Sequence, residues 1–285
     1  MNPQPLDRAA LAEHPLPPVI DGDKESKGRI LVIAGSPEVS GAALLTATAA
    51  MRAGAGKLRI ATVESVAPQL GMAMPEAMVL GMPQDEEGGF SATAVQPLAR
   101  EAAEVDAVVA GPGIKRNVTC GLLARTLLES DAALAFDVAL LKSLRQPDRE
   151  RKIPPILLPD TDELAALLDS DVGTVQEDPL GCGLRAAELY RSIVLAKGVV
   201  SHIATPGGDV WRHEGGAPGL GVSGSGDVLA GIVGGLLARG ADPLSALLWA
   251  VWLHGQAGAA LARRVGPIGF LAHEIADEIP ALLPV

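Results

Sequence analysis

The stretch Gly221-Val222-Ser223-Gly224-Ser225-Gly226-Asp227 runs directly into Val228-Leu229-Ala230-Gly231-Ile232-Val233-Gly234-Gly235-Leu236-Leu237, and together they decide the fold. The second half is apolar on every side, which predicts a helix buried inside a large domain. Gly224, Ser225 and Gly226 are small, so their backbone can approach a ligand closely. The unpaired N–H groups that begin a helix favour an anion such as phosphate. The stretch therefore indicates an anion site at the start of a central helix.

Asp227 stands where that anion would lie, and two explanations remain open. A carboxylate in the first turn complements the helix dipole, which is a purely structural role. A carboxylate beside a phosphate site can also take the proton of a hydroxyl that attacks the phosphate. The second role makes Asp227 a candidate general base.

Outward from this helix, short β-branched runs alternate with helical segments. This alternation predicts an α/β fold with a mostly parallel central sheet covered by helices on both faces. We expect one domain over residues 29–285, preceded by an N-terminal arm or short helix over residues 1–28. The expected strands are 29–36, 57–63, 106–110, 133–137, 155–159 and 192–198, with a hairpin at 202–205 and 209–213 and helices at 41–53 and 160–168.

Composition limits the possible partners. The 285 residues are 48% hydrophobic but only 2% aromatic, and the net charge is -11. Few aromatic side chains and an acidic surface argue against nucleic-acid binding. Cys120 and Cys182 fit no metal spacing, so we expect reduced thiols and a cytoplasmic protein without a signal peptide. The uncharged span 244–262 is rich in Ala and contains His254, so we expect a core helix and no membrane segment.

Polar and Gly-rich loops follow several of the expected strands. In a parallel sheet these loops meet at one edge, where ligands bind. The carboxylates at 160–163 either cap a helix or hold Mg²⁺, and Lys197 makes either a phosphate contact or a salt bridge. His202, His213, His254 and His273 show no metal-ligand spacing and are assigned no role. The loops are Gly35-Ser36, Gly111-Pro112-Gly113, Asp137, Asp160-Thr161-Asp162-Glu163 and Lys197-Gly198.

The ordered set of motifs from residue 27 to the C-terminus resembles the ADP/ATP-dependent NAD(P)H-hydrate dehydratases, whose fold is a ribokinase-like three-layer α/β/α sandwich. The motif G-S-G-D alone would indicate only the ribokinase superfamily; the whole order indicates the dehydratase branch. The motifs are G-A-A-L-L (41–45), G-A-G (54–56), P-E-A-M-V (75–79), V-V-A-G-P-G-I (108–114), F-D-V (136–138), P-x-x-x-E-L (159–164), Lys197-Gly198 and G-S-G-D-V-L-A-G-I (224–232).

The resemblance implies repair of hydrated NADH or NADPH: a nucleotide, ADP or ATP, phosphorylates the ring hydroxyl, and phosphate then leaves. It also implies a homo-oligomer, with tetramers common, and Mg²⁺ as cofactor. The implied catalytic residues are Asp227 as base and the amides of Gly224, Ser225 and Gly226. The nucleotide would contact Lys197, Gly198, Val199, Val200, Ser201 and Gly226. The hydrated cofactor would contact Ala43, Gly113, Asp160 and Asp227, and Glu163 would meet the metal.

The chain departs from the family pattern at two places. Asp160 stands where members usually carry His in T-P-H-P-G-E, and Val222 and Ser223 replace the Thr and a Gly of A-T-G-G-S-G-D. The spacing of Asp160 and Glu163 is similar to the Asn-x-x-Glu of the superfamily's kinases. Two alternatives therefore stay open: a kinase for a sugar or vitamin alcohol, and an inactive nucleotide-binding paralogue.

Overall fold

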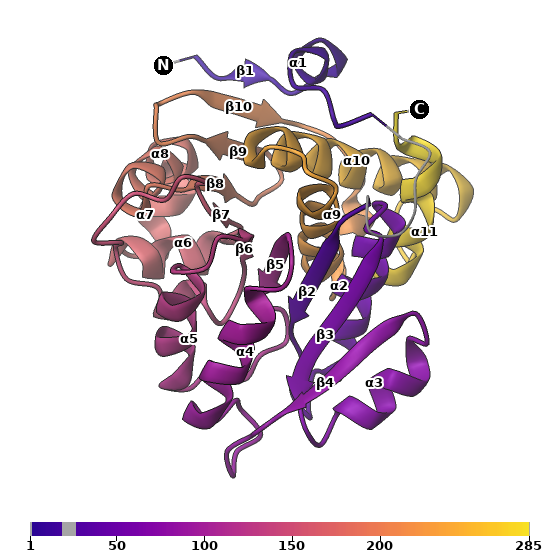
Figure 1. The fold of residues 1–285 in the computed structure, drawn as a ribbon. Helices are drawn as coiled ribbons and strands as arrows, with labels where there is room; N and C mark the ends of the chain where they lie inside the picture. Colours follow the sequence, from indigo (N-terminus) through magenta and orange to yellow (C-terminus); the bar gives the residue numbers. More distant parts are fainter. Residues whose placement is uncertain (1, 19–26, 285) are drawn as a thin grey trace.

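A computed structural model describes residues 2–18 and 27–284. In these residues ten strands form one sheet in the order β1-β10-β9-β8-β7-β6-β5-β2-β3-β4 (Figure 1). The bounds are β1 (Gln4–Pro5), β2 (Arg29–Ile33), β3 (Lys57–Val63), β4 (Ala77–Met82), β5 (Ala107–Ala110), β6 (Ala133–Phe136), β7 (Ile156–Leu157), β8 (Ile193–Ala196), β9 (Ser201–Ala204) and β10 (Val210–His213).

Two features of the topology position the site. β9 is antiparallel to β8 and β10, while the other neighbouring strands are parallel. The reversal of β9 brings the start of β9 and the ends of β8 and β10 to one edge. The chain also runs outward from β2 to β3 and β4 before it returns to β5 on the other side of β2. Parallel sheets bind ligands where the strand order reverses in this way.

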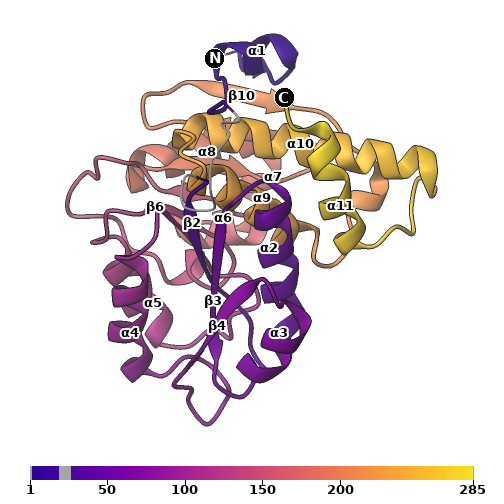
Figure 2. The same cartoon turned by 45° about the vertical axis from the view of Figure 1, so that its right-hand side comes forward.

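Helices cover both faces of the sheet and make a three-layer sandwich. α4 to α8 lie on one face, and α2, α3, α9, α10 and α11 lie on the other (Figures 1 and 2). Three short 3₁₀ turns connect them. The bounds are α1 (Arg8–Glu13), α2 (Ser40–Arg52), α3 (Ala67–Ala73), α4 (Val95–Ala102), α5 (Thr119–Leu127), α6 (Thr161–Leu168), α7 (Val172–Glu177), α8 (Pro179–Tyr190), α9 (Ser225–Ala238), α10 (Pro243–Arg264) and α11 (Ala272–Leu282), with η1 (Ala92–Ala94), η2 (Leu141–Ser143) and η3 (Pro218–Leu220).

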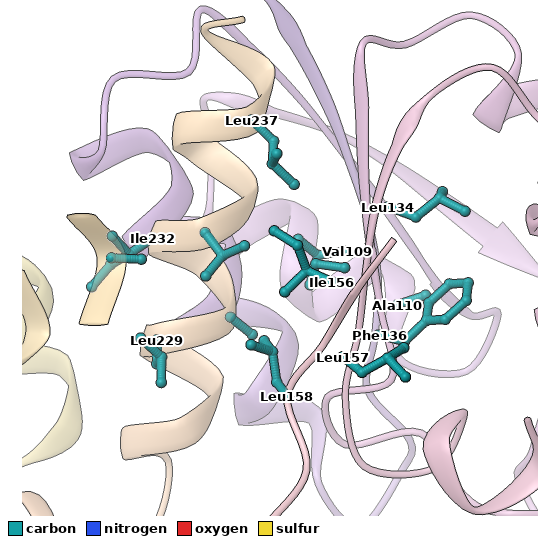
Figure 3. Close-up of a cluster of buried hydrophobic side chains, with 14 of the residues drawn as sticks. Val109, Ala110, Leu134, Phe136, Ile156, Leu157, Leu158, Leu229, Ile232 and Leu237 are labelled. Carbon is teal, nitrogen blue, oxygen red and sulfur yellow. The ribbon is translucent and has the colours of Figure 1, made fainter. Parts of the chain in front are cut away.

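α9 is the central helix of its layer. It packs on β5 and β6 below and against α2, α10 and α11 around it. Figure 3 shows Leu229, Ile232 and Leu237 of α9 in the same buried cluster as side chains of the strands. Gly231 faces α2 so closely that a Cβ there would lie 2.2 Å from the Thr46 carbonyl oxygen. The apolar run thus forms the buried helix that the sequence predicts. The missing side chain at Gly231 allows α2 to lie this close.

α10 is long and apolar enough to cross a membrane by length and composition alone. In the fold, however, 61% of its most apolar window is buried. It packs against α9 and α11, and its Trp249 donates a hydrogen bond to the His14 carbonyl oxygen in the segment after α1 (2.8 Å). α10 is therefore a core helix, as expected.

The expected α/β architecture is confirmed, and each expected strand and helix is present with modest shifts at its ends. The strand expected over 155–159 shortens to β7, because Pro155 and Pro159 have no N–H to donate to a neighbouring strand. Gly54 follows α2 with φ +102°, as expected for a residue that ends a helix. The N-terminal arm contains α1, and β1 adds to the sheet beside β10. Residues 19–26 of the arm lie outside the described residues.

Candidate functional site

A cleft of ≈ 1020 Å³ opens at the edge where β8 and β10 end and β9 begins. The start of α9 and one face of α10 form its other wall. Many residues singled out in the sequence meet here although they come from separate parts of the chain. The predicted residues that line it are Asp160, Lys197, Gly198, Val199, Val200, Ser201, Ser225 and Gly226.

The first turn of α9 presents unpaired donors, as the sequence predicts. Gly224 is the residue before the helix, with φ +89° and no side chain to cap the first turn. The Ser225 N–H bonds to the Val222 carbonyl oxygen (3.1 Å), and the first intrahelical bond runs from Val228 to Gly224. Within the described residues, the N–H groups of Gly224, Gly226 and Asp227 have no hydrogen-bond partner. This end of α9 can therefore bind an anion.

Asp227 lies in the first turn of α9 and is half-buried. Its main-chain oxygen accepts a hydrogen bond from the Thr46 hydroxyl on α2 (3.1 Å), which ties this turn to the neighbouring helix. Burial and the nearby carboxylate of Asp137 raise the pKa of Asp227 to about 6, although Lys197 opposes the shift. A carboxylate with this pKa is ionised at neutral pH and is basic enough to accept a proton from a substrate.

One lysine that lines the cleft and two carboxylates behind it form a charged cluster. Lys197 Nζ lies 2.9 Å from Asp137 Oδ1 and 3.9 Å from Glu163 Oε2. The Asp137 side chain is 1% exposed and that of Lys197 is 21% exposed. Burial disfavours the charge on Lys197, but the two carboxylates outweigh it and raise the pKa of the ammonium. Of the two roles open for Lys197, the structure shows the salt bridge.

The acidic segment at 160–163 forms a capping box. Asp160 Oδ1 accepts from the Glu163 N–H (2.8 Å), and Glu163 Oε2 accepts from the Asp160 N–H (2.9 Å). Glu163 is 3% exposed and does not line the cleft. Within the described residues, no three His, Cys, Asp or Glu side chains are grouped to hold a metal. The donors present do not fit a metal held by the protein alone.

The structure places Ala43 and Gly113 away from this cleft. Both lie at the point where the strand order reverses, where the Gly35 N–H bonds to the Pro112 carbonyl oxygen (2.8 Å). Ala43 is fully buried in α2, so its side chain touches no solvent. Gly113 lies against α2, and a Cβ there would be 2.7 Å from the Val39 carbonyl oxygen. These two residues border a second region of the sheet edge.

Two side chains near the cleft were missed by the sequence reasoning. His254, assigned no role, lines the cleft from α10, and its Nε2 lies 3.0 Å from the Ser225 hydroxyl and 3.2 Å from the Ser225 carbonyl oxygen. Burial lowers its pKa to about 4, so it is neutral at pH 7. Asp137 was recognised only as an acid that ends a strand. The partners of both residues lie far along the chain, so no local spacing reveals them.

Comparisons with known proteins agree with this geometry. The sequence model of the NAD(P)H-hydrate dehydratase family matches residues 30–281. An ADP-dependent (S)-NAD(P)H-hydrate dehydratase from Xanthomonas campestris is 45% identical over 96% of this chain and 94% of its own. The crystal structure of the Bacillus subtilis ADP/ATP-dependent NAD(P)H-hydrate dehydratase, co-crystallised with ATP/Mg²⁺, superposes with a TM-score of 0.85 at 28% identity, covering 99% of this chain and 98% of the other.

A ribokinase-like superfamily protein from Enterococcus faecalis, 24% identical, shares the fold with a TM-score of 0.82, covering 98% of this chain and 94% of the other. The sandwich, the open first turn of α9 and the family match over residues 30–281 lead to one conclusion. The chain belongs to the NAD(P)H-hydrate dehydratase family and has the ribokinase-like fold.

Proposed function

We propose that this protein repairs hydrated NADH or NADPH, using ADP, with ATP as a possible alternative donor. One observation carries the proposal: Asp227, half-buried with a pKa of about 6, shares the first turn of α9 with unpaired N–H groups, and Gly226 of that turn lines a large cleft. A proton acceptor beside an anion site is the arrangement that phosphoryl transfer to a hydroxyl requires. The ADP-dependent relative that is 45% identical supports ADP as the donor.

Asp227 takes the proton of the ring hydroxyl. The hydroxyl oxygen attacks the β-phosphorus of ADP, and the bond between that phosphorus and AMP breaks. The N–H groups of Gly224 and Gly226 stabilise the charge on the transferred phosphoryl group. The carbon–oxygen bond of the phosphorylated ring then breaks, phosphate leaves, and loss of a ring proton restores the double bond. Hydrated NADH and ADP give NADH, AMP and phosphate.

We assign the contacts of the nucleotide and of the hydrated ring from the residues that surround the cleft and the first turn of α9. Val199 is 99% exposed at its mouth, so it can cover the nucleotide base, and Lys197 and Gly226 lie together at the phosphate end. The hydrated ring would approach Asp227 from the side of Gly113 and Ala43, and Asp160 would meet it from the opposite wall. The Bacillus subtilis structure contains ATP/Mg²⁺. Because Glu163 is buried and bonded within the capping box, we propose that Mg²⁺ enters on the nucleotide phosphates.

The test is recovery of NADH absorbance from hydrated NADH with ADP or ATP and Mg²⁺. Asp227→Asn should abolish recovery while leaving ADP affinity similar or higher, because a negative charge near the phosphates is removed. Asp209→Asn, in the turn of the β9–β10 hairpin, is the matched control and should keep full activity. Recovery with Asp227→Asn would show that another group is the base, and no recovery by the wild type would refute the function.

A kinase for a sugar or vitamin alcohol is the second candidate, because Asp160 replaces the family's His and, with Glu163, has the spacing of the kinases' Asn-x-x-Glu. It predicts a stable phosphorylated alcohol and no NADH recovery. If the protein is an inactive nucleotide-binding paralogue, the wild type and Asp227→Asn should both bind ADP, and neither should turn over. We also propose a homo-oligomer located in the cytoplasm and a single ribokinase-like domain over 29–285 with residues 1–28 as an arm. Sedimentation, cell fractionation and limited proteolysis test these three points.

A further inference from the structure

Asp137 is a carboxylate that the proposed chemistry does not use. It directly follows β6, is 1% exposed and does not line the cleft. Its Oδ1 accepts from Lys197 Nζ (2.9 Å) and from the Val138 N–H (3.0 Å). A buried carboxylate is unfavourable unless it is paired and hydrogen-bonded, and here Lys197 supplies the pairing charge.

The backbone around Asp137 is held in an unusual conformation. Val138 has φ +44°, and the other described non-glycine residues with positive φ, Asp169 and Arg191, both end helices. Gly111, with φ +133°, lies so close that a Cβ would be 1.8 Å from the Asp137 carbonyl oxygen. Such conformations persist only where the surroundings enforce them, and they concentrate at functional sites. The fold therefore fixes this carboxylate in place.

Lys197 is held where a lysine is otherwise unfavourable. A Cβ built on Gly226 would lie 3.9 Å from Lys197 Nζ, so the ammonium stands beside the first turn of α9. The positive end of the helix dipole repels a cation there. A lysine side chain is also flexible and would turn toward water without a partner. The pair with Asp137 overcomes both effects and leaves the ammonium at the wall of the cleft.

We propose that Asp137 is a positioning residue for the nucleotide: it holds the Lys197 ammonium beside the first turn of α9, facing the phosphates, and touches no ligand itself. This inference rests on the proposed function. Without Asp137, the ammonium turns toward Glu163 or solvent and no longer neutralises the phosphates. The proposal differs from a purely structural salt bridge, which would affect folding but not the affinity of the folded protein.

The experiment measures the Kd of ADP by calorimetry, together with the KM for ADP and the unfolding midpoint. Asp137→Asn keeps the shape and should weaken ADP binding roughly 10-fold, a loss of one charged hydrogen bond. Lys197→Met should weaken it at least as much. Adding Asp137→Asn to Lys197→Met should change Kd by less than about twofold, because the two residues act as one unit. The double variant removes both charges of the Asp137–Lys197 pair, and Glu163 keeps its bond from the Asp160 N–H (2.9 Å), so we expect it to fold even if one single variant does not.

Glu101→Gln is the matched control. Glu101 Oε2 lies 2.6 Å from Arg59 Nη1 in a half-buried ion pair, and neither residue lines the cleft. It should leave Kd unchanged. ADP binding by Asp137→Asn that equals or exceeds wild type would overturn the proposal, as would a further loss when Asp137→Asn is added to Lys197→Met. If the wild type binds no ADP, the proposed function fails instead, so the two failures can be told apart.

Discussion

Removing Lys197 should destabilise the protein in a way that depends on pH. In Lys197→Met the Asp137 carboxyl loses its only charged partner within hydrogen-bond distance among the described residues, and at 1% exposure water cannot replace it. Protonation of Asp137 then removes the unfavourable buried charge from the folded protein. The unfolded chain has no such need, since its carboxyl has an ordinary pKa of about 3.9.

The magnitude follows from that difference. Holding a proton on a carboxyl at pH 7 costs about 4 kcal/mol, because each pH unit above its ordinary pKa adds about 1.36 kcal/mol. This value is an upper limit for the loss of stability. It is close to the roughly 3–5 kcal/mol lost when one member of a buried ion pair is removed. The penalty is present above the unfolded pKa and shrinks as pH falls, to about 1.5 kcal/mol at pH 5.

Denaturant unfolding of the ligand-free protein at pH 5, 6 and 7 measures this. Wild type and Lys197→Met should converge as pH falls, and the double variant with Asp137→Asn should regain most of the lost stability at pH 7. The midpoint of thermal unfolding at pH 7 should fall by about 8 °C, at roughly 2 °C per kcal/mol for a chain of this size. Equal stability of Lys197→Met and wild type at pH 7, or no rescue by the second substitution, would refute the reasoning.

Three further predictions follow from the site and its supporting helices. Turnover should fall about tenfold per pH unit below pH 6 and level off above it, because Asp227 acts only when ionised; a pH profile without this acid limb would exclude it as the base. His254→Leu should lose about 1 kcal/mol at pH 7 with its bond to Ser225. Since the pKa of His254 is lowered to about 4, wild type should lose more stability than His254→Leu as pH falls from 6.5 toward 4, measured by denaturant unfolding. Gly231→Ala should destabilise by about 1–3 kcal/mol through contact with the Thr46 carbonyl oxygen, whereas Gly71→Ala in α3, with nothing within 4 Å, should stabilise by about 0.5–1 kcal/mol in the same assay.

The central parts of the fold could be read from the sequence because their signals are local. β2, β5 and β6 are continuous apolar runs, as buried parallel strands are, and Gly54 marks the end of α2. β4 was missed although its sequence A-M-V-L-G-M is apolar throughout; it lies at the edge of the sheet, where only Met82 of its six residues is buried. The pairing of β1 with β10 joins residues more than 200 positions apart, and no local pattern predicts it.

The site divides in the same way. The small residues before α9 and Asp227 within it were recognisable because glycine and a first-turn acid have local meanings. The capping role of Asp160 was also foreseen, as one of two alternatives. The Asp137–Lys197 pair and the bond from His254 to Ser225 are contacts between distant elements, and composition could not reveal them. Ala43, Gly113, Gly224, Glu163 and Asp227 do not line the cleft, and their roles stay predictions.

The close contact of α9 with α2 has a consequence for how this protein can change over time. Gly231 and Gly235 each leave no room for a methyl group, since a Cβ would lie 2.2 and 2.4 Å from carbonyl oxygens of α2. A side chain at either position would therefore meet the backbone of α2. The opposite wall of the cleft, residues 214–222, consists of loop and η3, and all of its residues except Gly219 are half-buried or exposed. Substitutions that change ligand preference, in natural drift or directed evolution, will accumulate in that wall. The sequence of α9 will change less.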